Sequence, residues 1–138
     1  MSNFGMGVML GMLGGNEETV NTLRNSLNKT IEKVWLDEEK NKLIFNFTDG
    51  SGMQIFDDGQ SCCEYRYMRT DDDLSEFSGS KIVNIELKDG PTKNNDEWDD
   101  VHETQFLDVT TDKGFFQLCT HNEHNGYYGG FWIVAKPI

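Results

Sequence analysis

The sequence predicts a mostly β protein of the α+β class: an antiparallel meander of about 7–8 strands with one or two short helices. Three observations support this. Apolar residues alternate with polar ones in most segments after residue 30, which is the period of a half-buried strand. Tight-turn signals such as Asp49-Gly50 separate the segments. The chain also contains nine Phe, three Trp and four Tyr, enough apolar area for a β-rich core.

The first predicted element is an amphipathic helix over residues 17–28. Val20, Leu23 and Leu27 recur at helical spacing, Asn16 is a suitable cap, and acidic residues fill the first turn. From residue 30 the period changes to two. The predicted strands cover residues 31–36, 42–48, 53–56, 62–68, 81–88, 103–110, 114–120 and 130–136. Short connections favour antiparallel pairing, because parallel strands need long crossovers.

Two connections have their own signals. Thr70 and Asp73 have the spacing of a capping box, so a short helical turn is predicted there, ending at Gly79. Residues 89–91 (Asp-Gly-Pro) predict a turn that ends the preceding strand and opens a polar loop reaching Asp100. Trp98 within that loop is interpreted either as an anchor for the loop or as a ring facing a ligand.

With 138 residues the chain is predicted to form a single domain over residues 16–138, preceded by an apolar tail over residues 1–15. The tail holds four of the six methionines and is rich in glycine. Two readings remain open. The tail is mobile, or it packs on another subunit, since methionine-rich surfaces adapt to a partner. The second reading predicts a homo-oligomer.

Charge and cysteine content limit the classes of partner. The formal net charge of −12 disfavours binding to nucleic acid or to an anionic membrane, because both require a basic face. Three cysteines, two of them adjacent, make a poor disulfide framework, so we expect reduced thiols and a cytoplasmic location. The apolar start lacks the basic residues of a secretory signal and is too short to span a bilayer.

The strongest candidate for a ligand site is the run Tyr65, Arg66, Tyr67 and Arg69, which holds two of the three arginines of the chain. Guanidinium groups pair with phosphate, and the rings of tyrosine accept a flat base. Asn125, Tyr127 and Tyr128 follow at a tight turn and are predicted to complete the rim of the same pocket. The alternative interpretation is cross-strand packing plus a salt bridge from Glu64 to a neighbour.

A weaker candidate is a metal site made of Cys119, His121 and His124. Thiolate and imidazole are zinc ligands, but this spacing matches no standard zinc finger or ribbon. The alternative is a buried thiol with two exposed histidines. No phosphate-binding loop, nucleophile elbow or dinucleotide fingerprint is present, so neither enzymatic activity nor a cofactor is predicted.

An ordered set of short motifs carries a family resemblance. They are Asp49-Gly50, Cys62-Cys63-Glu64, Asp73-Leu74 with Gly79, the segment 111–114, and Asn125-Gly126-Tyr127-Tyr128. Over about residues 28–134 the chain resembles an uncharacterised family of small phage and bacterial proteins that is classed as a domain of unknown function. The resemblance implies a phage setting. Small acidic phage proteins without catalytic motifs include sponges, oligomers that hold a nucleotide-derived signal without cutting it.

Together these observations favour a non-enzymatic phage protein in the host cytosol that sequesters a small, anionic, nucleotide-like ligand as part of anti-defence. Two other functions remain open. One is a protein inhibitor that blocks a host defence enzyme with its acidic loops or apolar tail. The other is a zinc-dependent enzyme that uses the cysteine and histidines near residue 120.

Overall fold

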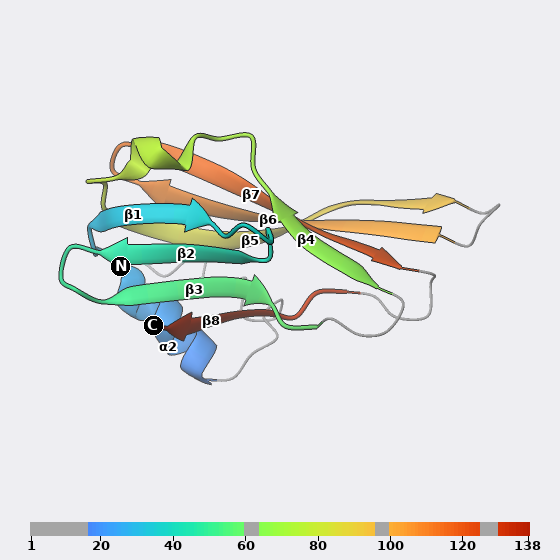
Figure 1. The fold of residues 1–138 in the computed structure, drawn as a ribbon, viewed down its shortest axis with the longest axis horizontal. Helices are drawn as coiled ribbons and strands as arrows, with labels where there is room; N and C mark the ends of the chain where they lie inside the picture. Colours follow the sequence, from blue (N-terminus) through green and yellow to red (C-terminus); the bar gives the residue numbers. More distant parts are fainter. Residues whose placement is uncertain (1–16, 60–63, 96–99, 125–129) are drawn as a thin grey trace.

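The computed structural model describes residues 17–59, 64–95, 100–124 and 130–138, and it confirms a mostly β fold of the α+β class (Figure 1). The predicted tail over 1–15, Cys62, Cys63 and Trp98 lie outside the described residues. The elements in chain order are α2 (Glu17–Ser26), β1 (Ile31–Leu36), β2 (Lys42–Phe47), β3 (Gly52–Asp57), β4 (Tyr65–Arg69), the 3-10 helix η1 (Leu74–Phe77), β5 (Ile82–Asn95), β6 (Asp100–Thr111), β7 (Gly114–His124) and β8 (Ile133–Pro137). No helix in these ranges is long and apolar enough to cross a membrane.

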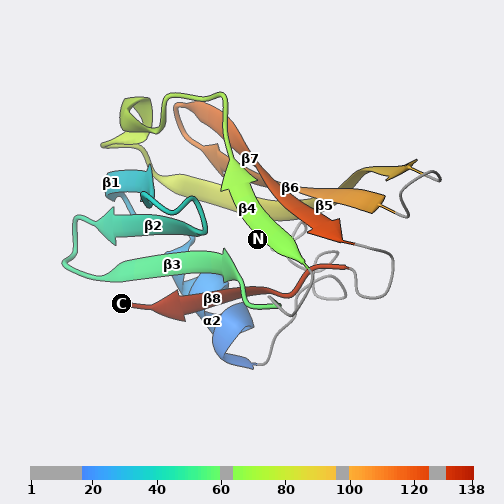
Figure 2. The same ribbon diagram turned by 45° about the vertical axis from the view of Figure 1, so that its right-hand side comes forward.

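The described strands form two four-stranded antiparallel sheets, in the orders β1-β2-β3-β8 and β4-β7-β6-β5. Hairpins join β1 to β2 and β2 to β3, and in the second sheet β5 to β6 and β6 to β7, in agreement with the short turns in the sequence. Two strands return instead to a partner far away in sequence: β8 pairs with β3, and β4 pairs with β7. These two pairings carry β4 along one edge of the second sheet, where the candidate site lies (Figure 2).

A single apolar core lies between the sheets. Alternate residues of the strands point inward, as the period of two requires. Phe45 of β2 and Phe116 of β7 face each other with ring centroids 6.4 Å apart, and Phe77 of η1 packs on Phe116 at 4.9 Å. Leu23 of α2 is buried in the same core. The amphipathic pattern of α2 therefore serves to cover the sheet beside β8.

Backbone contacts also join the two sheets directly. At one end, the Ile31 amide donates to the Ser80 carbonyl at 2.7 Å, next to a bridge between Thr30 and Lys81. At the other, the Met68 amide of β4 donates to the carbonyl of Lys40, in the turn between β1 and β2, at 2.6 Å. This second contact holds β4 against the β1–β2 turn and forms one wall of a hollow described below.

Three sequence predictions were wrong in detail. β5 does not end at residues 89–91 but continues to Asn95, with a register shift between Asp89 and Thr92. Proline is tolerated there because β5 is an edge strand. β7 does not break at His121 but runs to His124, since β4 and β6 pair with it on both sides. Finally, η1 is capped by Asp73, whose carboxylate accepts from the Ser75 amide, rather than by Thr70.

Candidate functional site

The two faces of β4 have different surroundings. β4 pairs with β7 in a register that sets Tyr67 opposite His121 and Arg69 opposite Cys119. Tyr65, Tyr67 and Arg69 lie on the outer face of the sheet, and Arg66 and Met68 lie on the inner face. Residues three apart on a strand point to opposite sides. The structure therefore does not bring Arg66 and Arg69 together, as the predicted pairing of both with one anion would require.

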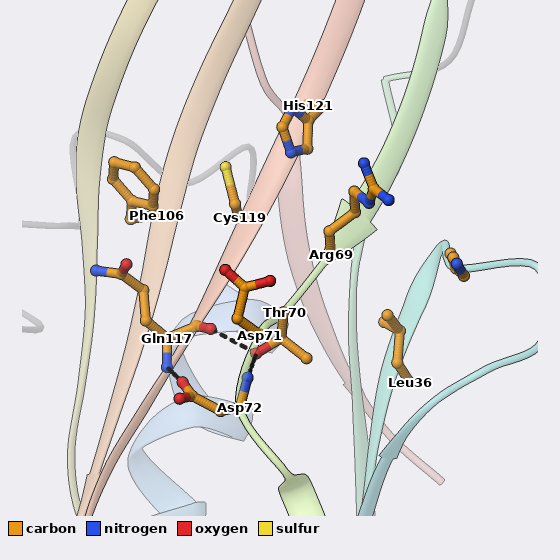
Figure 3. A pocket seen from close by; sticks show the side chains of 10 residues that line it. Leu36, Arg69, Thr70, Asp71, Asp72, Phe106, Gln117, Cys119 and His121 are labelled. Atoms are coloured by element: carbon orange, nitrogen blue, oxygen red, sulfur yellow. Dashed lines mark hydrogen bonds between the residues drawn. The ribbon is translucent and has the colours of Figure 1, made fainter.

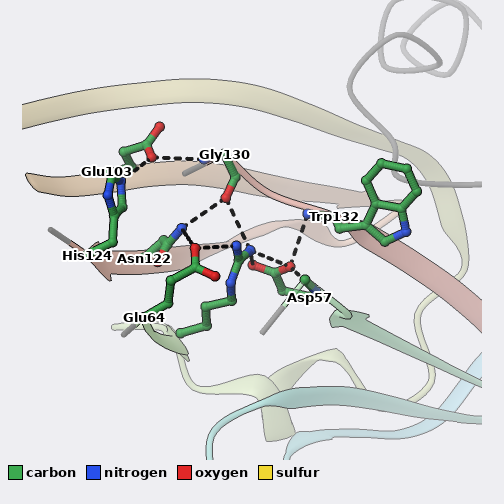
Figure 4. Close-up of polar contacts among 9 residues, drawn as sticks. Asp57, Glu64, Glu103, Asn122, His124, Gly130 and Trp132 are labelled. Carbon is green, nitrogen blue, oxygen red and sulfur yellow. Dashed lines mark hydrogen bonds and ion pairs between the residues drawn. The ribbon is translucent and has the colours of Figure 1, made fainter. Parts of the chain in front are cut away.

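Arg66 is the centre of a buried ion network, and Figure 4 labels its partners Asp57, Glu64 and Gly130. Its Nη1 donates to both carboxylate oxygens of Asp57, at 2.7 and 2.9 Å, and its Nη2 donates to Glu64 Oε2 at 2.6 Å. The Arg66 side chain is only 7 % exposed, and those of Asp57 and Glu64 are 4 % and 0 % exposed. Its Nε is buried without a partner among the described residues. Arg66 therefore holds parts of the fold together and presents no donor to the outer face.

The network extends across the gap between the sheets. Asn122 of β7 donates from Nδ2 to Glu64 and to the Gly130 carbonyl, at 3.0 and 3.1 Å. Asp57 of β3 also accepts from the Trp132 amide at 3.0 Å, just before β8. Since β3 belongs to one sheet and β4 to the other, the ion pair between Arg66 and Asp57 ties the two sheets together, and Asn122 adds a link from β7 to the segment before β8. One interpretation of the sequence was a salt bridge from Glu64 to an unspecified neighbour. That neighbour is Arg66.

On the outer face, four rings form a row across three strands: Tyr65, Tyr67, His121 and His102. Tyr65 and Tyr67 are 4.8 Å apart between ring centroids, Tyr67 stacks on His121 at 4.6 Å and 7°, and His121 lies 5.0 Å from His102. We call this set the ring row. Tyr67 is enclosed by its two neighbours. Tyr65 at the end of the row is 63 % exposed and has a free surface for stacking.

Polar contacts fix the middle of the ring row. The Tyr67 hydroxyl donates to Glu123 at 2.7 Å, and burial together with this bond raises the pKa of Tyr67 to about 12. Burial lowers the pKa of His121, and the nearby His102 and Arg69 lower it further. His121 is therefore neutral at pH 7. It contributes a flat, uncharged ring beside the charge of Arg69.

A hollow of about 680 Å³ opens beside the ring row (Figure 3). Its floor is formed by the outer face of β6 and β7, and its wall by the segment that follows β4 and by the β1–β2 turn. The lining residues are Leu36, Lys40, Arg69, Thr70, Asp71, Asp72, Phe106, Gln117, Cys119 and His121. Figure 3 shows the Asp71 carboxylate in the middle of the hollow, below Cys119, with Arg69 on the β4 side.

The wall of the hollow is held in place by hydrogen bonds to β7. The Thr70 hydroxyl donates to the Gln117 carbonyl at 2.8 Å, and the Gln117 amide donates to Asp72 at 2.9 Å. Asp71, between these two anchored residues, takes no part in the ion pairs of the described residues, and neither do Arg69 and Lys40. One carboxylate and two cations in the lining thus remain without ion pairs within the described chain.

The remaining predicted site residues are not brought into one place. Asn125, Tyr127 and Tyr128 lie outside the described residues, so their predicted contribution to the rim stays a prediction. Cys119 and His121 share the outer face of β7. His124 lies on the inner face, where its Nε2 contacts Glu103 at 2.6 Å. Burial raises the pKa of the Cys119 thiol, which disfavours the thiolate form.

Three lining residues had no signal in the sequence. Lys40 belongs to a turn, Asp71 to an acidic run that is typical of solvated surface, and Phe106 to the strand predicted over residues 103–110. They come from segments distant in sequence, and only the pairing of β4 with β7 places them together. No local pattern could have identified them as a group.

Residues 24–134 match the family described as Domain of unknown function (DUF7448), and the chain belongs to this family. No curated protein and no solved structure matches the chain. The resemblance to an uncharacterised domain family is therefore confirmed at the level of the family.

Proposed function

We propose that this protein is a non-enzymatic binding protein that holds a small anionic ligand of the nucleotide type in the hollow beside Arg69. The observation that supports the proposal is the pair of cations in the lining, Arg69 and Lys40, which form no ion pair among the described residues. Both cations line the same hollow of a chain whose net charge is −12. A phosphate group satisfies both, with the guanidinium offering two parallel donors.

The rest of the lining suits the other parts of such a ligand. Phe106 and the neutral ring of His121 offer apolar and aromatic surface to a flat base. The Asp71 carboxylate accepts hydrogen bonds from ring or exocyclic N–H groups of the base. The volume of about 680 Å³ is within the range of small-molecule sites. A ligand with a phosphate, a ring and N–H donors therefore fits each kind of side chain present.

The proposal extends to the setting that the sequence resemblance implies. The protein is then a phage product that assembles from several copies in the host cytosol and sequesters a nucleotide-derived signal of host defence. The absence of known catalytic motifs from the sequence supports sequestration rather than cleavage. Incubating the candidate ligand with the protein and recovering it unchanged after denaturation would test this part.

Titration calorimetry with nucleoside monophosphates, cyclic dinucleotides and ADP-ribose tests the binding proposal. At least one of these ligands is expected to bind wild-type protein, and Arg69→Ala is expected to weaken it about 10- to 100-fold, the usual cost of losing a charge-assisted contact. Arg24→Ala is the matched control, because Arg24 is an exposed arginine of α2 outside the hollow. Absence of binding for every ligand, or equal affinities for the two variants, would contradict the proposal.

A second function, inhibition of a host protein, is favoured by exposed aromatic residues. Tyr65 and Phe115 are each 63 % exposed, and the strand registers place both on the outer face of the second sheet. Large exposed rings are common anchors of protein interfaces. Affinity purification from host lysate separates the two functions. A stoichiometric protein partner lost in Tyr65→Ala but kept in Arg69→Ala supports the inhibitor.

A further inference from the structure

At its β6 end, the ring row contains two histidines whose ring nitrogens are within hydrogen-bond distance of each other. His102 lies on β6 and His121 on β7, in a diagonal position across the strand pair. His102 Nε2 and His121 Nδ1 are 2.8 Å apart, and the ring centroids are 5.0 Å apart. The distance is that of a hydrogen bond between the two rings. The same two nitrogen atoms are those that a metal ion would use.

We propose that His102 Nε2 and His121 Nδ1 form a two-imidazole site for a divalent transition-metal ion of the zinc type. Two imidazoles on one tetrahedral zinc ion, with Zn–N bonds of about 2.0–2.1 Å, have ring centres about 5 Å apart and ligating nitrogens about 3.3 Å apart. The ring centres are therefore already at the required separation. Each ring has to tilt in place so that the two nitrogens separate by about 0.5 Å.

The surroundings hold the His121 ring in place within reach of an ion. The face of His121 is stacked on Tyr67, which is itself fixed by its hydrogen bond to Glu123. Such supporting contacts orient histidine ligands in metal sites. Both histidines are only partly buried, so an ion from solvent has access to them.

The protein supplies two ligands rather than a closed cage. No group of three or more His, Cys, Asp or Glu residues in the described part of the chain is placed to hold a metal ion. Glu123 lies opposite His102, but its carboxylate accepts from the Tyr67 hydroxyl. Water then fills the remaining positions of the ion. A structural zinc site is closed by four protein ligands, so a site with two is not of the structural type.

This set differs from the cysteine and histidine cluster that the sequence suggested. His124 is excluded because it faces inward and contacts Glu103. Cys119 lies opposite Phe106 of β6 and not opposite a histidine, and no group of three or more metal-ligating residues in the described part of the chain includes it. His102 takes their place because β6 and β7 pair along their whole length. The site adjoins the hollow through His121, which lines it, whereas His102 does not, so His102→Ala tests the metal site apart from the proposed ligand.

The test is a titration of the full-length, tag-free protein with zinc chloride, followed by calorimetry. Wild-type protein is expected to bind one ion at this site. His102→Ala and His121→Ala are each expected to weaken this binding at least about tenfold, and Cys119→Ser is expected to leave it unchanged. Absence of zinc binding in the wild type, equal binding in His102→Ala and wild type, or loss of binding in Cys119→Ser would overturn the proposal.

A second measurement removes any dependence on how well the variants fold. Zinc is added to wild-type protein labelled with ¹⁵N, and the imidazole nitrogens are followed by NMR. The shifts of His102 Nε2 and His121 Nδ1 are expected to change, while those of His124, on the opposite face of β7, stay constant. Unchanged shifts of His102 and His121 at saturating zinc would show that the pair is a hydrogen bond and nothing more.

Discussion

Arg66 and Arg69 are three residues apart on β4, yet their surroundings are opposite. Arg66 faces inward, where two carboxylates and the Gly130 carbonyl surround its guanidinium. Arg69 faces outward into a hollow and forms no ion pair with the described residues. The same side chain therefore acts in one case as an internal tie between two sheets and in the other as a free cation. A charged group is available to a ligand only where the fold leaves it without a partner.

The largest expected difference between the two arginines is in stability. Arg66→Ala leaves Asp57 and Glu64 buried without their cation, and we expect a loss of about 3–5 kcal/mol in the free energy of unfolding. Arg69→Ala removes an exposed side chain, so its effect should stay within about 0.5 kcal/mol. Urea unfolding followed by tryptophan fluorescence measures both.

Arg66→Lys is a milder substitution at the same position, to be measured where Arg66→Ala does not fold. The ammonium keeps the charge but cannot donate to both carboxylates in the geometry of the guanidinium fork, so an intermediate loss is expected. Arg24→Ala serves as a second exposed control. Equal losses for the Arg66 and Arg69 variants would contradict the assignment of a structural role to Arg66 alone.

A smaller effect is expected at Gly59, which lies against the Arg66 guanidinium. A Cβ atom at Gly59 would lie 2.7 Å from Arg66 Nη1, closer than such atoms approach. Because the guanidinium is fixed by its ion pairs, Gly59→Ala should reduce the free energy of unfolding by about 1–3 kcal/mol. Asp58→Ala, at the neighbouring exposed residue, is the control and should change the free energy of unfolding little.

A double-mutant cycle sharpens this prediction. If the clash with Arg66 causes the loss, Gly59→Ala should cost markedly less in an Arg66→Lys background, where the guanidinium is absent. An undiminished loss in that background would show that the alanine acts on the backbone and not on the network.

The smallest expected effect is on the outer face, at Tyr67. Its pKa is raised to about 12, above the value of about 10 for an unfolded chain. The folded state therefore keeps the Tyr67 hydroxyl proton up to a higher pH than the unfolded state does. The resulting stabilisation is complete below pH 10 and is lost as the pH rises from 10 towards 12. Absorbance at 295 nm should show one tyrosine titrating late, and Tyr67→Phe should remove that step.

Tyr67→Phe should also cost about 0.5–1 kcal/mol at pH 7, because the hydrogen bond to Glu123 is exposed. Tyr65→Phe is the matched control on the same face, and it should leave the late step in place. A titration in which all tyrosines of wild-type protein ionise near pH 10 would contradict the role assigned to Glu123.

The predicted elements agree with the structure where a local pattern was sufficient. β1 has the predicted bounds, and β2 and β3 differ from the prediction by a residue or two at the ends, because their apolar residues alternate and Asp49-Gly50 closes the hairpin. The prediction failed at residues 89–91 and at His121, where polar, glycine and proline residues resemble turns. Pairing with neighbouring strands keeps both segments extended, and that pairing is a tertiary property.

For the candidate site, the sequence predicted the correct strand, β4, but not the residues from other segments that its side chains meet. Tyr67, Arg69 and His121 lie together on one face, as the period of two allows. Arg66 was assigned to the ligand because the sequence could not show that Asp57, nine positions earlier, would meet it. Lys40, Asp71 and Phe106 were not found at all. Each belongs to a segment whose position depends on how β4 docks.

By itself, the sequence determined the properties that depend on near neighbours: the β-rich class, most strand positions, the faces on which side chains lie, and an acidic surface. The tertiary structure alone decided which charges are paired and which remain free. The physical reason is the difference in range. Backbone alternation and turn preference act over a few residues, whereas an ion pair depends on two distant segments meeting within about 4 Å.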